Sequence, residues 1–191
     1  MITTLKTAAL KEPIGLAEVK EHLRLELSDI AEDDNLIALI RSARSMAENI
    51  TGRKLITQTW YYYLQDWPIR DYIILPYGSL QSVTAVTYTD SSETSNTFSS
   101  TYYYADSDSD PGRVVLRYGD VWPSDTLDSK NPIRIEFTCG YGLNPSDVPQ
   151  PIRQAMKLMI SADYNNRLPT QPEDRAIHTK LANYRLFWSF E

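Results

Sequence analysis

The side chains best suited to catalysis or metal binding are few and scattered in this sequence. Its two histidines, His22 and His178, lie far apart, and its single cysteine, Cys139, stands in the stretch FTCGYG. A zinc site needs several such ligands at close spacing, and no phosphate-binding or nucleophile-elbow glycine motif occurs. We therefore expect no metal, no cofactor and no enzymatic activity. Cys139 is predicted to be a small, partly buried strand residue.

The acidic stretch DSDSD at 106–110 comes nearest to a metal-binding motif. It resembles the opening of an EF-hand calcium loop, whose sixth position is glycine and whose twelfth is a bidentate glutamate. Here the sixth position is Pro111 and the twelfth is Arg117. We interpret the stretch as an acidic turn.

Aromatic side chains point to contact surfaces instead of catalysis. Eleven of the 13 tyrosines lie between residues 57 and 145, and tyrosine suits interfaces because it joins a large apolar ring to a polar tip. In the stretch TWYYYL, strand alternation places Trp60, Tyr62 and Leu64 on one face, which we assign to the core. Tyr61 and Tyr63 share the other face. They are candidates for a subunit interface, and a half-exposed sheet face explains them equally well.

A second group of candidate interface residues lies at the C-terminus. We expect residues 184–191 to dock on a partner or a neighbouring subunit, because exposed aromatics at a chain end seldom serve the subunit alone. The alternative is that this tail folds back onto its own core. The candidates are Tyr184, Leu186, Phe187, Trp188 and Phe190.

Composition limits the class of protein. The 191 residues are 42% hydrophobic, enough for a real core, and no apolar run is long enough to span a membrane. The start of the chain lacks the pattern of a secretory signal, and one cysteine cannot form an internal disulfide, which fits synthesis in a reducing cytoplasm. The net charge of −6 comes from residues 57–145, with 5 basic and 11 acidic side chains. Such a region can enclose DNA loosely but should not grip its phosphates.

Apolar periodicity predicts helices in both terminal parts of the chain. Residues 16–27 should form one helix, with Leu27 on its apolar face, and a longer helix should run from the acidic patch at 32–35 to Gly52 as its C-cap. Met46 falls on the apolar stripe of that longer helix, whereas Arg41, Arg44 and Glu48 fall on the opposite face and are predicted to be solvated. After Pro149, a stripe predicts a third helix, and a fourth should cover about 173–184. The residues of the third stripe are Ile152, Ala155, Met156, Met159 and Ile160.

The middle of the chain has strand composition, rich in Thr, Ser, Val and Tyr between turn-forming stretches. The expected strands are 57–66, 71–75, 81–90, 98–104, 113–117 and 132–139. The predicted class is α+β: a helical core of about four helices with an inserted antiparallel β-module. Residues 1–56 should supply the N-terminal core helices, 57–145 the β-rich module, and 146–191 the C-terminal helices and aromatic tail that complete one domain with the first segment.

An ordered set of short motifs is similar to the head–tail connector, or head-completion adaptor, proteins of long-tailed bacteriophages. The motifs are LAEVKEHLRL at 16–25, the helix and following strand start at 33–60, LPYGSLQSVTAVTYTD at 75–90, PGRVV at 111–115, IRIEFTCGYG at 133–142 and VPQPIRQAMKLMISADYNNR at 148–167. Two departures are Gly15, where a Ser or Thr helix cap is usual, and the bulky Tyr61 and Tyr63. Residues after 168 carry no part of the resemblance.

The resemblance implies a structural virion protein at the head–tail interface. Such subunits form a ring, usually twelve-fold, that docks beneath the portal protein and meets a tail or stopper protein. The ring lines the channel through which genomic DNA leaves the head, without sequence-specific binding. A closed ring requires two different complementary patches on each subunit. Two other hypotheses stay open from the residues alone: a tail-associated carbohydrate- or receptor-binding module, and a hydrolase using clustered carboxylates.

Overall fold

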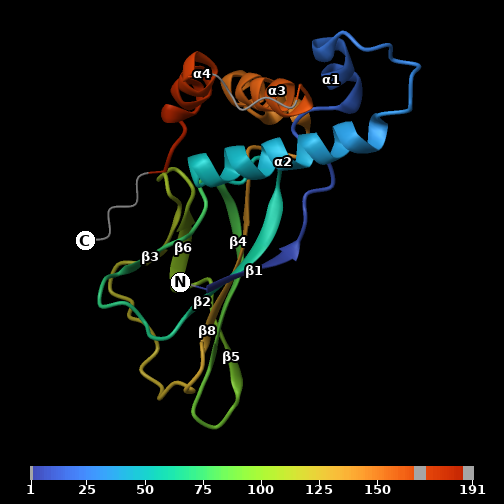
Figure 1. Ribbon diagram of the computed structural model, residues 1–191. Coiled ribbons are helices and arrows are strands. Elements are labelled where there is room, and N and C mark those ends of the chain that lie inside the picture. Colours follow the sequence, from blue (N-terminus) through green and yellow to red (C-terminus); the bar gives the residue numbers. More distant parts are fainter. Residues whose placement is uncertain (1, 166–170, 187–191) are drawn as a thin grey trace. The chain divides into compact units, whose positions relative to one another are not determined.

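The computed structural model describes residues 2–165 and 171–186. The chain divides into two compact units (Figure 1). The β unit comprises Met1–Ala8 and Thr57–Gly140, and the helical unit comprises Ala9–Ile56 and Tyr141–Glu191. The described residues form four α-helices and two antiparallel sheets, so the predicted α+β class is confirmed.

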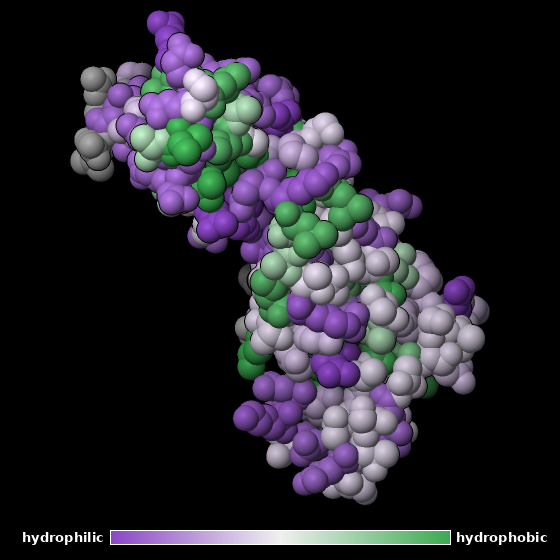
Figure 2. Space-filling model, turned by 90° about the vertical axis from the view of Figure 1, so that its right-hand side faces the viewer, coloured by the Kyte–Doolittle hydropathy of each residue, from purple (hydrophilic) through white to green (hydrophobic). Residues whose placement is uncertain are grey.

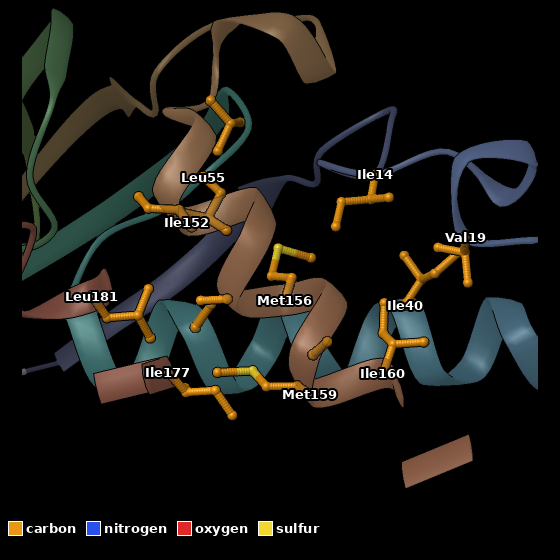
Figure 3. Packing of buried hydrophobic residues seen from close by; sticks show 14 of the residues in the cluster. Ile14, Val19, Ile40, Leu55, Ile152, Met156, Met159, Ile160, Ile177 and Leu181 are labelled. Atoms are coloured by element: carbon orange, nitrogen blue, oxygen red, sulfur yellow. The ribbon is translucent and has the colours of Figure 1, made fainter. Parts of the chain in front are cut away.

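Four helices build the core of the helical unit: α1 (Leu16–Leu23), α2 (Asp33–Thr51), α3 (Gln150–Tyr164) and α4 (Gln171–Ala182), with a short 3-10 helix, η1 (Pro145–Asp147), before α3. The apolar stripe predicted for α3 is buried throughout. Figure 3 shows its side chains meeting those of α1, α2 and α4, with Met156 near the middle of the labelled group. Gly52 ends α2 in the left-handed conformation, at a φ of 71°, as expected of a C-cap.

Two apolar residues predicted for this core lie outside it. Helix α1 ends at Leu23, because Arg24 adopts a left-handed conformation at a φ of 60° and its N–H closes the last turn onto Glu21. Leu27 therefore falls in the following loop and is 54% exposed. Met46 is 49% exposed because the buried stripe of α2 is narrower than its sequence pattern suggested. Gly15 caps α1 without a side-chain hydrogen bond, consistent with the absence of Ser or Thr.

Glu48 corrects the prediction of a fully solvated face on α2. Its side chain is only 5% exposed, and its carboxylate accepts hydrogen bonds from the Leu55 backbone N–H and the Lys54 ammonium, both at 3.1 Å. Arg44 lies 3.9 Å away and binds Glu12 at 2.7 Å. The buried carboxylate thus joins the end of α2 to the segment that follows it.

Two sheets make up the β unit. The larger has the order β1 (Ile2–Thr7), β2 (Gln58–Leu64), β8 (Ile133–Cys139), β4 (Leu80–Thr89) and β5 (Ser95–Phe98). The smaller has the order β3 (Tyr72–Ile74), β7 (Arg113–Leu116) and β6 (Tyr103–Asp106). Strand β1 was not expected, and the expected strand 98–104 is divided, since β5 ends at Phe98 and β6 begins at Tyr103. The first six described residues, assigned to the helical segment, instead pair with β2 from Ile2↔Tyr63 to Leu5↔Trp60.

The core of the β unit lies between these two sheets. Its buried side chains come from the inner face of the larger sheet, including Tyr62, Ile135 and Phe137, and from the smaller sheet, including Ile73 and Val114. Trp60 and Leu64 pack against this cluster, so the face predicted for the core is confirmed. Cys139 is fully buried there.

Candidate assembly surface

Tyr61 and Tyr63 lie on the outer face of the larger sheet. Their neighbours along β2 point into the core, and the register places Tyr61 beside Glu136 and Tyr63 beside Arg134 on β8. Both tyrosines are half-buried. Since the smaller sheet packs on the inner face, this outer face points away from it.

Two charged side chains lie over the ring of Tyr61, which in turn contacts the ring of Tyr63. The ring centres are 6.3 Å apart. The Arg134 guanidinium lies 5.0 Å from the centre of the Tyr61 ring, and the Lys6 ammonium lies 5.4 Å from it. Lys6 also donates to Glu136 at 2.7 Å, and this hydrogen bond raises the pKa of the Lys6 ammonium above its usual value. A cation over an aromatic face is held by the electrostatic field of the ring, so the Lys6 and Arg134 side chains have defined positions.

An open pocket of about 340 Å³ adjoins Tyr63. It is lined by Ile2, Thr4, Tyr63, Lys130 and Asn131. Lys130 and Arg134 are exposed, and neither has a carboxylate partner among the described residues. We call Tyr61, Tyr63, Lys6, Lys130 and Arg134 the tyrosine face. In Figure 2, which views the molecule from the right-hand side of Figure 1, small hydrophilic patches interrupt broad areas of intermediate hydropathy in the β unit.

Charge is segregated within the β unit. It contains six basic side chains, and three of them belong to the tyrosine face. Its acidic side chains instead concentrate in turns, at 90–93, 106–110 and 120–128. In the turn at 106–110, Asp106 accepts hydrogen bonds from the Ser109 hydroxyl at 2.6 Å and from Arg113 at 2.7 Å, and these hold its pKa down at about 2. This turn is therefore an internally bonded element, with Asp108 exposed.

The described part of the C-terminal tail lies against the helical core. Tyr184 is half-buried and packs on the core cluster. Its carbonyl accepts a hydrogen bond from the Arg53 guanidinium at 2.5 Å, and the Leu186 N–H donates to the Thr51 carbonyl at 2.8 Å. Phe187, Trp188 and Phe190 lie outside the described residues. The tail interface therefore stays a prediction, with its first residues attached to their own unit.

The groups first considered for chemistry do not converge. His22 contacts the Ser161 hydroxyl at 2.9 Å and His178 lies 3.6 Å from Asp174. Within residues 2–165 and 171–186, no group of His, Cys, Asp and Glu side chains is placed to hold a metal ion. Across the same residues, no helix is long and apolar enough to cross a membrane.

Sequence reasoning found the two tyrosines but missed the cations around them. Lys6 and Arg134 are far from Tyr61 in sequence, and only the pairing of β1 and β8 with β2 brings the three together. The available signal was the alternation of basic and acidic residues in IRIEF, with Arg134 and Glu136 on one face of a predicted strand.

Comparison with solved structures extends over the whole chain. Superposition on a chain from the neck of an empty gene transfer agent (GTA) particle, computed with C6 symmetry, gives a TM-score of 0.84 at 23% identity. The alignment covers 100% of this chain and 98% of that one. The two chains share one fold.

Two further structures agree. A chain from the virion of the native GTA particle gives a TM-score of 0.81 at 23% identity, and one from the native neck, computed with C12 symmetry, gives 0.79 at 22% identity. Both alignments cover 100% of this chain and 98% of the other. No protein-family model and no curated protein matches the sequence.

Proposed function

We propose that this protein is a structural subunit of the neck of a phage-like particle. In this role its copies form a ring, twelve-fold in number, that joins the portal to the tail or stopper protein and lines the DNA exit channel. The observation that carries the proposal is the match of the entire chain, at a TM-score of 0.84 and with 98% of the other chain covered, to a particle-neck chain. A shared fold does not by itself establish a shared function; the near-complete coverage of both chains is what supports a shared role for the whole chain.

Rotational symmetry supports the ring. The neck structures that contain similar chains were computed with C6 and C12 symmetry. A subunit of a closed ring needs two unlike patches, one for each neighbour. The β unit offers two surfaces of opposite character, the cationic tyrosine face and the acidic turns.

The charge balance fits a channel through which DNA passes without adhering. The net charge is −6, and phosphate contacts require clustered Lys and Arg that remain accessible. In the proposed ring the tyrosine face is covered by protein, and the acidic side chains that lie outside the contacts between subunits remain toward solvent. Localisation in the virion, after synthesis in the host cytoplasm, follows from the same proposal.

The decisive experiment removes the protein from a particle-producing cell. Without it, heads should fill with DNA but fail to join tails, and labelled protein supplied in trans should appear at the neck by electron microscopy. Normal joining in its absence would refute the proposal. Purified portal protein should also capture the chain, whereas binding to a glycan array with no portal binding would favour the carbohydrate-binding alternative.

The tail prediction needs a narrower variant than deletion of 184–191, because that deletion also removes the contacts of Tyr184 and the Leu186 N–H with the helical unit. A chain ending after Leu186 keeps both contacts and lacks Phe187, Trp188 and Phe190. We expect it to fold normally and to lose affinity for the portal or for neighbouring copies. Unchanged portal binding and ring formation would exclude the partner role of these three side chains.

A further inference from the structure

The tyrosine face has the composition of a protein interface and no occupant within its own unit. Tyrosine and arginine are enriched at interface cores, and here Arg134 is positioned over Tyr61 at 5.0 Å without a carboxylate partner among the described residues. Lys130 lies at the rim of the adjoining pocket. Only Lys6 has an acidic partner, Glu136, so two positive charges stay uncompensated.

We propose that the tyrosine face binds the acidic turn at 106–110 of a second copy of this chain. This proposal rests on the proposed ring and names the contact that holds neighbouring subunits together. In it, Arg134 and Lys130 of one copy face the exposed Asp108 of the next. The Tyr61 and Tyr63 rings lie beside this pairing of charges on the same face.

The charge of the tyrosine face calls for an acidic occupant. The turn at 106–110 carries three carboxylates, and Asp106 is already neutralised by Arg113 at 2.7 Å. Asp108 is exposed and has no partner among the described residues. Opposite potentials on two surfaces steer association and fix the register of a contact. The turn also begins in a fixed conformation, because Asp106, Ser109 and Arg113 bind one another, which lowers the entropic cost of binding.

Topology requires that the contact be between copies. The acidic turn connects β6 to β7 in the smaller sheet. That sheet packs on the inner face of the larger one, and the tyrosine face is the outer side. A turn of the smaller sheet therefore cannot reach the tyrosine face of its own chain. Two unlike patches on opposite sides of one unit give a heterologous contact, which is the type that closes rings.

A charge-swap cycle tests the contact. The variants Arg134→Glu, Asp108→Arg and the double variant are compared with the wild-type full-length chain by sedimentation velocity over a range of concentrations and at low and high salt. Each single variant should weaken self-association at least about tenfold, and the double variant should recover to within about threefold of wild type. Wild-type association should weaken as salt rises. Arg175→Glu and Glu21→Arg, at exposed sites in the helical unit, are the matched controls for a change in charge.

The contact would be overturned if the wild-type chain stayed monomeric at every soluble concentration, or if the single variants associated like wild type. It would also be overturned if the double variant lost as much free energy of association as the two single variants added together. DNA binding that Arg134→Glu abolishes would assign the face to phosphate instead and would also overturn it. Failure here is distinguishable from failure of the neck function. If the charge-swap variants still enter particle necks normally, the proposed contact is wrong and the neck role stands. If the charge-swap cycle gives the expected affinities but the protein is absent from particles, the neck role is wrong and the contact stands.

Discussion

The Glu48 carboxylate accepts the backbone N–H of Leu55 at 3.1 Å, seven residues further along the chain. The same buried carboxylate accepts a hydrogen bond from the Lys54 ammonium, and the two charge-assisted contacts fix the path of the chain after α2.

Replacing Glu48 with alanine should therefore destabilise the protein by about 3 kcal/mol, because the Leu55 N–H and the Lys54 ammonium lose a buried partner. Glu48→Gln, which keeps an acceptor but no charge, should cost about half as much. Chemical denaturation measures both. Glu21→Ala, on the exposed side of α1, is the control, and equal losses in all three variants would contradict the special position of Glu48.

Met156 provides a test of the helical core. It is fully buried among the side chains of the helical unit, so Met156→Ala should cost about 2–5 kcal/mol through lost burial and the cavity left behind. Met46→Ala, the same substitution at a position 49% exposed, should cost less than about 1 kcal/mol. Thermal unfolding followed by circular dichroism distinguishes the two, and similar shifts in Tm would show that the core is not where the structure places it.

Gly112, just before β7, lies against Leu80 at the start of β4. A Cβ atom there would lie 2.4 Å from Cβ of Leu80, so Gly112→Ala must displace β4 or the start of β7. We expect a loss of about 1–3 kcal/mol. Gly15→Ser, where a Cβ meets nothing within 4 Å, should gain a few tenths of a kcal/mol as a helix N-cap. A Gly112→Ala variant as stable as wild type would argue against tight sheet packing.

The lowered pKa of Asp106 predicts that its contribution to the stability of the fold changes with pH only in the acid range. Its pKa is lowered from 3.8 to about 2 by the Ser109 hydroxyl and then by Arg113. A carboxyl with a depressed pKa in the folded state contributes stability that is present above its unfolded value and is lost as pH falls through the folded value. Between about pH 4 and pH 2 the free energy of unfolding of the wild type should thus fall by about 1 kcal/mol, a figure already reduced for solvent screening. Asp106→Asn should lack this stabilisation already at neutral pH. Asp108→Asn should follow the wild-type curve, and an Asp106→Asn curve parallel to wild type through this range would refute the assignment.

How far the sequence predicts this molecule depends on the range of the interactions involved. The α2 helix, its Gly52 cap and the α3 stripe were predictable because helix periodicity and capping act over a few residues. Strand β1 was not, since Ile2 and Leu5 are three apart and do not alternate as strand residues do. It is a strand because β2 pairs with it.

The same limit applies to the assembly surface. Alternation along β2 correctly separated Tyr62, in the core, from Tyr61 and Tyr63 on the outer face. The arrival of Arg134 and Lys6 beside Tyr61 depends on the register of three strands distant in sequence, and no local pattern specifies that register. Glu48 was misplaced because the helical pattern alone does not show that the chain turns back over this face of α2.

The edge strand β1 is made from the first residues of the chain, and its partner β2 begins after the entire N-terminal helical segment. An expression product starting at residue 57 would therefore leave one side of β2 unpaired, beside Tyr61 and Tyr63, and such edges recruit other strands. A purification tag fused directly before Ile2 would lie at the sheet margin and beside the tyrosine face. A cleavable tag, or a tag placed within the loop between α1 and α2, keeps that margin native for assembly measurements.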